Sequence, residues 1–244
     1  MVTVCWVTST VWWLVVARGT SPTLPAIAWA VVAGIAEGGY VLSLGRALRD
    51  APLGLAYGVT RGGAMVIVWP VSIAFLGERP SALALGGAAA LGCGLAIVSI
   101  ASRGRSGARL GWSWVTAVFI AGYHLAYGRA LASGIGAATA VTISIGIGVV
   151  AAHIGLPRGD RSRPLLGLVR QPLVLGIGGV LSAASFLVFL EGLARTGAGA
   201  ALSLRNTSIV FTIVFSALMG ERATARQWLG AIVVAGGAVL IGAS

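Results

Sequence analysis

Residues Phe75–Ser81 read FLGERPS, and residues Leu218–Thr224 read LMGERAT. The chain of 244 residues has only six acidic side chains, yet the tripeptide Gly-Glu-Arg occurs twice, each time between two long apolar segments. This pattern predicts that the same type of connector between two helices occurs twice in the chain. The organisation of the rest of the sequence follows from comparing what surrounds the two copies.

The composition indicates an integral membrane protein. Hydrophobic residues make up 57% of the chain and charged residues only 9%, with a mean hydropathy of +0.96, whereas soluble domains carry about 25% charged residues. The apolar segments have the roughly 17–25 residues that a helix needs to cross a bilayer. We therefore predict an all-α, multi-pass protein of the cell (inner or plasma) membrane, with the lipid bilayer as its surroundings.

The net charge of +11 does not predict nucleic-acid binding. The arginines lie mostly between the apolar segments, where they act as topology signals, and their concentration in alternate loops predicts a cytoplasmic N-terminus. We expect about nine transmembrane helices, joined by short loops, at residues 3–17, 25–45, 52–76, 81–101, 111–132, 135–156, 172–194, 198–218 and 225–243.

The two connectors belong to a longer internal repeat. Residues 76–101 align with 219–244, and further upstream Arg61 aligns with Arg205. The identical pairs are Gly77/Gly220, Glu78/Glu221, Arg79/Arg222, Ala82/Ala225, Gly87/Gly230, Ala88/Ala231 and Gly94/Gly237. Five predicted helices separate the connectors, and because this number is odd the connectors lie on opposite membrane faces. The sequence thus predicts two inverted repeats, residues 1–101 and 110–244, an arrangement common in secondary transporters.

The two copies also resemble a known family. The segments YGVTRGGAMVIVWPVSIAFLGERPS and LRNTSIVFTIVFSALMGERATARQWLGAIVVAGG are similar to the drug/metabolite transporter superfamily of the EamA type. The resemblance implies two repeats of five helices, with a Leu-Gly-Glu motif between the fourth and fifth, so that the first of the usual ten helices is absent here. It implies a secondary active transporter of small metabolites or drugs that works by alternating access, with export favoured.

Ionisable side chains inside the apolar segments are the candidate substrate-binding residues. A charge in hydrocarbon costs at least about 2.5–3.5 kcal/mol and therefore points to function. The candidates are Glu37, Arg61, Glu191, Arg205, Asn206, His124 and Tyr127.

Helix geometry suggests how the charged candidates pair. Glu37 and Arg61 each lie about 18 Å from the turn between their helices, and Glu191 and Arg205 lie roughly 9–12 Å from theirs. The two arginines either hold an anionic group such as a carboxylate, with an acid balancing them or binding a proton, or form buried ion pairs that only fix the helices. His124 and Tyr127 share a helix face and either line a cavity or pack the core.

The repeated connector itself is interpreted as structural. Gly77 and Gly220 can end the helices before them. Glu78 and Glu221 precede the next helix, whose N-terminal end favours an acid, and Arg79 and Arg222 complete the two copies. The small-residue pairs Ala88/Gly92, Ala231/Ala235 and Gly58/Gly62 predict close helix packing.

Other function classes stay open at this point. One alternative is a non-transporting nine-helix membrane remnant or partner protein, and another is a translocator of lipids or lipid-linked substrates. The sequence has none of the usual hydrolase or metalloprotease motifs, so we expect no enzyme activity, no catalytic residue, no cofactor and no metal. The expected partner is a small, anionic substrate, and a homodimer is left open.

Overall fold

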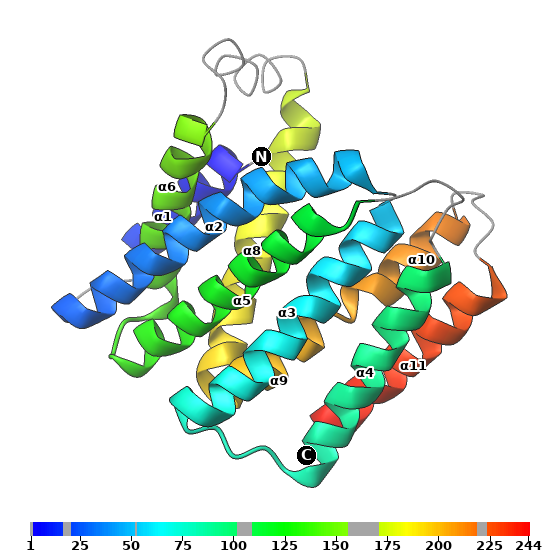
Figure 1. The fold of residues 1–244 in the computed structure, drawn as a ribbon. Coiled ribbons are helices and arrows are strands. Elements are labelled where there is room, and N and C mark those ends of the chain that lie inside the picture. Colours follow the sequence, from blue (N-terminus) through cyan, green and yellow to red (C-terminus); the bar gives the residue numbers. More distant parts are fainter. Residues whose placement is uncertain (1, 17–20, 52, 102–108, 156–170, 219–223) are drawn as a thin grey trace. The chain divides into compact units, whose positions relative to one another are not determined.

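A computed structural model describes residues 2–16, 21–51, 53–101, 109–155, 171–218 and 224–244. These residues form helices and no strand (Figure 1). The helices are α1 (Val2–Val16), α2 (Leu24–Asp50), α3 (Leu53–Leu76), α4 (Ala82–Ala101), α5 (Gly111–Ala132), α6 (Ala137–Gly155), α8 (Pro172–Thr196), α9 (Ala198–Arg205), α10 (Ser208–Leu218) and α11 (Ala225–Gly242).

Six of the described helices are long and apolar enough to cross a membrane, namely α2, α3, α4, α6, α8 and α11. Large apolar side chains such as Val66, Phe75 and Val188 are largely exposed on their surfaces, as expected for helices whose outer faces contact lipid. The predicted all-α membrane fold is confirmed. Each predicted apolar segment contains a helix, but the segment 198–218 is divided into α9 and α10.

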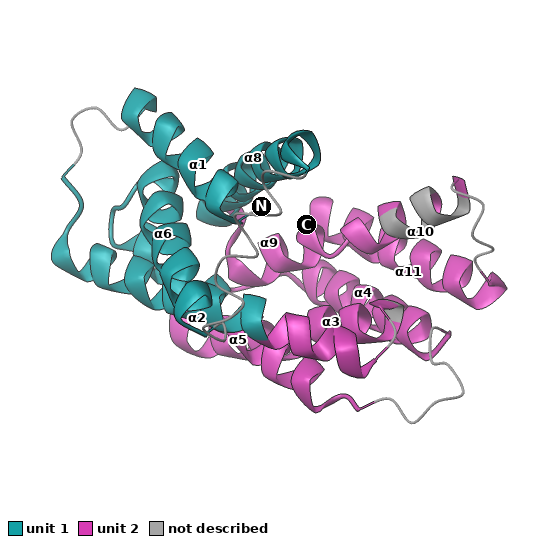
Figure 2. Ribbon diagram, turned by 90° about the horizontal axis from the view of Figure 1, so that it is seen from above, with its two compact units in different colours: residues 1–42, 122–195 teal, residues 43–121, 196–244 magenta. Residues whose placement is uncertain are grey.

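The chain separates into two compact units (Figure 2). Unit 1 comprises residues 1–42 and 122–195, and unit 2 comprises residues 43–121 and 196–244. Helices α2 and α5 each contribute residues to both units. The units therefore do not follow the predicted repeats 1–101 and 110–244, because each unit draws helices from both halves of the sequence.

In unit 2, α4 and α11 lie side by side along a seam of glycines (Figure 1). A Cβ atom added to Gly87 would lie 2.7 Å from the carbonyl oxygen of Gly237, and one added to Gly94 would lie 2.7 Å from that of Gly230. In the repeat alignment Gly87 corresponds to Gly230, and Gly94 corresponds to Gly237. The contact between Gly87 and Gly237 is therefore the repeat-related equivalent of the contact between Gly94 and Gly230. This antiparallel, two-fold contact is what an inverted repeat requires.

The seam corrects one packing prediction. A Cβ atom at Gly92 would meet no atom within 4 Å, and Ala235 is exposed. Of the predicted pairs Ala88/Gly92 and Ala231/Ala235, only Ala88 and Ala231 are buried. The close approach is made instead by glycines seven residues apart, two turns of helix, which keeps them on one face.

The first connector is described by the structure, and it differs from the prediction in one respect. Gly77 follows the last residue of α3 with a φ of 72°, a left-handed conformation that glycine adopts readily, so its predicted role as a helix terminator is confirmed. The Glu78 carboxylate, however, accepts hydrogen bonds from the backbone N–H groups of Ala198 and, at 3.3 Å, Gly199. These groups begin α9, whereas the N-terminus of α4 is capped by the Ser81 hydroxyl.

Glu78 therefore stabilises the positive end of a helix from the other repeat rather than the next helix in the chain. Arg79 is exposed. The second copy of the connector, Gly220, Glu221 and Arg222, lies outside the described residues.

Candidate functional site

Unit 2 contains a helix that breaks beside a buried arginine. Between α9 and α10, the N–H groups of Thr207, Ile209 and Val210 bond to carbonyl oxygens three residues earlier, instead of four. The Thr207 hydroxyl also donates to the Leu204 carbonyl oxygen at 2.7 Å, so a side chain occupies an acceptor that the helix would use. A tightened stretch of this kind inside a long helix often marks a functional hinge.

Asn206 connects this break to α3. Its side chain is buried, and its Nδ2 atom lies 3.4 Å from the backbone oxygen of Arg61. Arg61 is 7% exposed, and its Nη2 atom donates to the Tyr57 hydroxyl at 3.0 Å, with the guanidinium carbon 5.1 Å from the centre of the Tyr57 ring. A buried guanidinium over an aromatic ring is a cation–π contact, which offsets part of its desolvation.

Arg205, the last residue of α9, lies within electrostatic range of the same tyrosine, and the Ser208 side chain lies near the Tyr57 hydroxyl. The predicted residues Arg61, Arg205 and Asn206 are thus brought together in unit 2. We refer to Tyr57, Arg61, Arg205, Asn206 and Ser208 as the arginine cluster.

The N-terminal half of the broken helix is held firmly. Glu78 binds the first N–H groups of α9, and the Trp69 Nε1 atom donates to the Ser203 hydroxyl at 3.0 Å in a buried position. The Trp69 ring also lies where a Cβ atom on Gly199 would be, so a larger residue there would push α9 away from α3. These contacts fix α9 up to the break.

Unit 1 contains the second cluster, around Glu37 of α2. Glu37 is 6% exposed. Its two oxygens each lie 2.7 Å from a hydroxyl, one from Tyr127 of α5 and the other from Ser144 of α6, and the two hydroxyls also contact each other. We refer to these three side chains as the carboxyl ring.

Glycines make this approach of α2 and α6 possible. A Cβ atom on Gly34 would lie 2.5 Å from the Ser144 carbonyl oxygen, and one on Gly148 would lie 3.3 Å from the Glu37 Cβ. The helices can therefore approach more closely than larger residues would allow. Gly146 serves another neighbour, because its missing side chain leaves room for the Trp6 ring of α1, whose Nε1 atom donates to the Thr142 carbonyl oxygen at 3.2 Å.

His124 lies one aromatic ring away from the carboxyl ring. Its imidazole is fully buried, stacks on Tyr123 with ring centres 4.4 Å apart, and meets the edge of Phe189 at 4.9 Å. Tyr123 in turn contacts Tyr127 edge to face. His124 and Tyr127, predicted to share a face, thus belong to one aromatic layer on α5.

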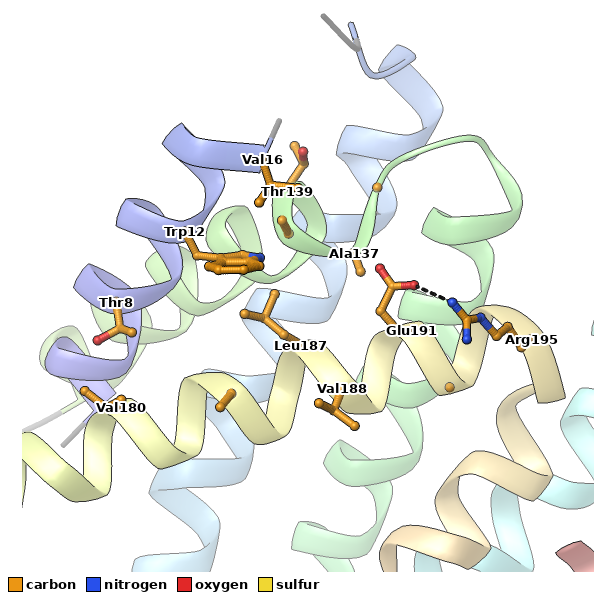
Figure 3. A pocket seen from close by; sticks show the side chains of 14 residues that line it. Thr8, Trp12, Val16, Ala137, Thr139, Val180, Leu187, Val188, Glu191 and Arg195 are labelled. Carbon is orange, nitrogen blue, oxygen red and sulfur yellow. Dashed lines mark ion pairs between the residues drawn. The ribbon is translucent and has the colours of Figure 1, made fainter. Parts of the chain in front are cut away.

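Glu191 of unit 1 has a partner on its own helix. It forms an ion pair of 3.7 Å with Arg195, one turn along α8, and these side chains are 58% and 78% exposed. The pair borders a cavity of about 850 Å³ in unit 1, which is otherwise lined mainly by apolar residues of α1 and α8. Figure 3 shows Trp12 and Leu187 facing this space, with the ion pair at one end.

Comparison with known families agrees with this picture. Residues 111–243 match the model of the EamA-like transporter family. The chain belongs to this family. It is thereby a membrane transporter of the drug/metabolite transporter superfamily, as the repeated connector indicated, and EamA transporters are generally not enzymes. Among curated proteins, none matches the sequence.

The EamA assignment leaves the individual site residues as predictions. The suggested pairings of Glu37 with Arg61 and of Glu191 with Arg205 join residues of different units, and they stay predictions. Across the described part of the chain, no group of three or more histidine, cysteine or acidic side chains could hold a metal ion.

Two serines of these clusters were not singled out from the sequence. Ser144 and Ser208 lie within apolar segments, where serine commonly bonds to its own helix. One available signal was the pair of glycines that follows Ser144 at 146 and 148, because glycines near a polar residue mark a closely packed helix face.

Proposed function

We propose that this EamA-like protein is a secondary active transporter of small metabolites or drugs that carry an anionic group, and that it works by alternating access in the cell membrane. The observation that carries the proposal is the broken helix α9–α10 with the arginine cluster at its break. Discontinuous helices and buried charges characterise substrate sites in secondary transporters. Export is favoured on family analogy alone.

The cluster suits an anion because it gathers positive charge beside hydroxyl groups. Arg61 donates to the Tyr57 hydroxyl, and Arg205 lies within electrostatic range of the same tyrosine. A planar carboxylate can accept two parallel bonds from a guanidinium group, which makes arginine selective for it. The Tyr57 and Ser208 hydroxyls add donors for a ligand's remaining oxygens.

The break gives this site a means of moving. α9 is fixed to α3 and to the connector by Trp69 and Glu78, whereas α10, after the break, packs against α11. A pivot at Asn206–Thr207 would change the orientation of α10 and leave α9 in place. Residues at the end of an element commonly absorb such changes.

A ligand screen with the purified full chain tests the anion site. Candidate metabolites are offered as pairs, each carboxylate beside its neutral amide, and binding is read as an increase in thermal stability. A ligand at 100 times its Kd adds about 2.7 kcal/mol to the stability of the folded state. We expect carboxylates to bind and their amides to bind much more weakly, and bound carboxylates to be transported into proteoliposomes.

Arg61→Gln is the decisive variant, and Arg49→Gln is its control, because Arg49 is an exposed arginine in the last turn of α2. A charge-assisted hydrogen bond contributes about 1.5–3 kcal/mol, so Arg61→Gln should weaken carboxylate binding roughly 10- to 150-fold. Unchanged binding and transport in Arg61→Gln would exclude Arg61 as a substrate ligand. A chain that binds and transports nothing in the screen would favour the non-transporting alternative.

The cavity in unit 1 favours a second candidate function, the translocation of lipids or lipid-linked substrates. Its walls include strongly exposed apolar side chains such as Val188, and its Glu191–Arg195 pair could meet a zwitterionic headgroup. A lipid translocase would move fluorescent phospholipid between leaflets of a vesicle, and Val188→Asp would slow it while leaving carboxylate transport unchanged. The anion transporter would show the opposite dependence, on Arg61.

A further inference from the structure

The number of protons in the carboxyl ring distinguishes two states of Glu37. The ring has three side chains and three contacts: Glu37 with Tyr127, Glu37 with Ser144, and Tyr127 with Ser144. Each hydroxyl supplies one proton, and an ionised carboxylate supplies none. If both hydroxyls donate to the carboxylate, no proton remains between Tyr127 and Ser144, whose oxygens then meet lone pair to lone pair.

A protonated Glu37 removes this deficit. Its O–H donates to Ser144, the Ser144 hydroxyl donates to Tyr127, and the Tyr127 hydroxyl donates to the other oxygen of Glu37. Each of the three contacts then holds one proton, and each group donates once. Burial of the ring, with Tyr127 and Ser144 fully enclosed, adds to the preference, because hydrogen bonds left unmade in a buried site cost free energy.

We propose that Glu37 is a proton-binding site of this protein, and that the bound proton closes the ring which ties α2, α5 and α6 together. The proposal rests on the proposed transport function and names its coupling ion. The closed ring favours the conformation in which the three helices touch. Release of the proton removes one of three contacts, so the proton acts as a ligand that shifts the population of that conformation.

The groups around the ring decide how its proton is measured. From α1, the buried Cys5 lies within electrostatic range of Glu37. From α5, Tyr127 belongs to the ring, with Tyr123 and His124 behind it. From α6, Ser144 and Gly148 face Glu37. Because a thiol and an imidazole also titrate, the readout must be specific for a carboxylic acid.

Infrared difference spectroscopy of the full chain in lipid bilayers, with no substrate added, provides that readout. The pH is raised from about 6 to about 9, above the range in which exposed carboxyl groups titrate. We expect a carboxylic-acid C=O band at the lower pH that disappears as the pH rises. Glu37→Gln should lack the band. Asp50→Asn, which removes an exposed acid from the same helix, should keep it.

A second variant covers the case in which Glu37→Gln does not fold. Tyr127→Phe removes the hydrogen bond to one Glu37 oxygen and leaves the carboxyl group in place. In this variant the Ser144 hydroxyl alone satisfies the one remaining contact with an ionised Glu37, so the band should disappear at a lower pH than in the original chain. Where the band is present it should lie at higher wavenumber, because a C=O bond that loses its hydrogen-bond donor stiffens. This displacement assigns the band to Glu37 without altering Glu37 itself.

Two results would overturn the proposal. If no Glu37-dependent band appears at the lower pH, the residue is ionised throughout, and if the band is unchanged at the higher pH, the proton is permanent and cannot couple to transport. The result is independent of the ligand screen. A chain that binds carboxylates through Arg61 and shows no titrating Glu37 keeps its proposed transport function and loses only its proton site.

Discussion

Replacing Gly94 with alanine should separate α4 from α11. A Cβ atom at this position would lie 2.7 Å from the carbonyl oxygen of Gly230 and 2.7 Å from the backbone nitrogen of Val234. Backbone atoms cannot turn aside as the end of a flexible side chain can, so the helices themselves must move apart. Gly92→Ala, on the same helix, is the matched control, because a Cβ atom at Gly92 would meet no atom within 4 Å.

The comparison of these two variants isolates the cost of packing. Both exchange a mid-helix glycine for alanine, and both gain about the same 1 kcal/mol of helix propensity. Overpacking a well-fitted contact costs typically about 1–3 kcal/mol, and the separated helices also lose dispersion contacts along the seam. We therefore expect Gly94→Ala to be less stable than Gly92→Ala by about 2 kcal/mol.

Reversible unfolding in mixed detergent micelles, followed by far-UV circular dichroism, measures this difference. The two-fold character of the seam provides an internal replicate, since Gly237→Ala and its control Gly236→Ala repeat the comparison on α11. Equal stability of Gly94→Ala and Gly92→Ala would refute the close contact. A loss at Gly94 without a matching loss at Gly237 would refute its symmetry.

Two further substitutions test how α9 is held. Glu78→Gln removes the charge from the N-terminal end of α9 and should cost about 1 kcal/mol of unfolding free energy, whereas the exposed Arg79→Gln should change it by less than about 0.5 kcal/mol; equal effects would contradict the capping role. Trp69→Phe should cost about 2 kcal/mol by leaving the buried Ser203 hydroxyl without its donor, and in that background Ser203→Ala should cost less than in the original chain. Additive losses in this double-mutant cycle, measured by the same unfolding assay, would show that the two side chains do not interact.

The positions of the helices were predictable because hydropathy alone determines them. Every predicted apolar segment holds a helix, with most ends within a few residues of the expected ones, such as 111–132 for α5. A membrane helix must satisfy its own backbone hydrogen bonds, so an apolar segment of sufficient length has few alternatives to a helix. The symmetry of the repeat could likewise be obtained by counting helices between the connectors.

The helix break could not be predicted in this way. When Arg61 is aligned with Arg205, Gly62 and Gly63 of the continuous helix α3 align in sequence with Asn206 and Thr207. The latter two residues lie at the break between α9 and α10. Glycine is the poorer helix former, so propensity alone places the break in the wrong repeat. Tertiary and local side-chain contacts decide instead, since Asn206 reaches α3 and Thr207 bonds to its own turn.

The partners of the charged residues were also beyond sequence reasoning. Glu37 and Tyr127 were both candidates, but 90 residues separate them, and nothing in the spacing pairs them with each other or with Ser144. Glu78 illustrates the same limit, because its acidic side chain was correctly expected at a helix N-terminus, while the helix is α9 rather than α4. Local rules identify what a residue needs, and the fold determines which neighbour supplies it.

The two repeats thus have equivalent structures at the α4–α11 contact, and they have different structures at the helix break, where we propose that the protein moves. Four of the identical positions, Gly87, Gly94, Gly230 and Gly237, form the α4–α11 seam, whose close backbone contacts leave no slack for rearrangement. The arginine cluster, in contrast, combines one continuous helix with one broken helix, so its two halves cannot respond alike to a ligand.

A rigid, symmetric seam beside an asymmetric hinge gives one element that keeps its geometry and one that can pivot against it. Stiffening the hinge should therefore slow transport without weakening the seam. Stiffening can be tested directly with Thr207→Ala, which frees the Leu204 carbonyl oxygen for the helical bond. The free energy of unfolding of this variant should equal that of the original chain to within about 0.5 kcal/mol, or be slightly higher. Its transport rate should fall. An unchanged rate would argue that the break is a fixed feature of the site and that the moving element lies elsewhere.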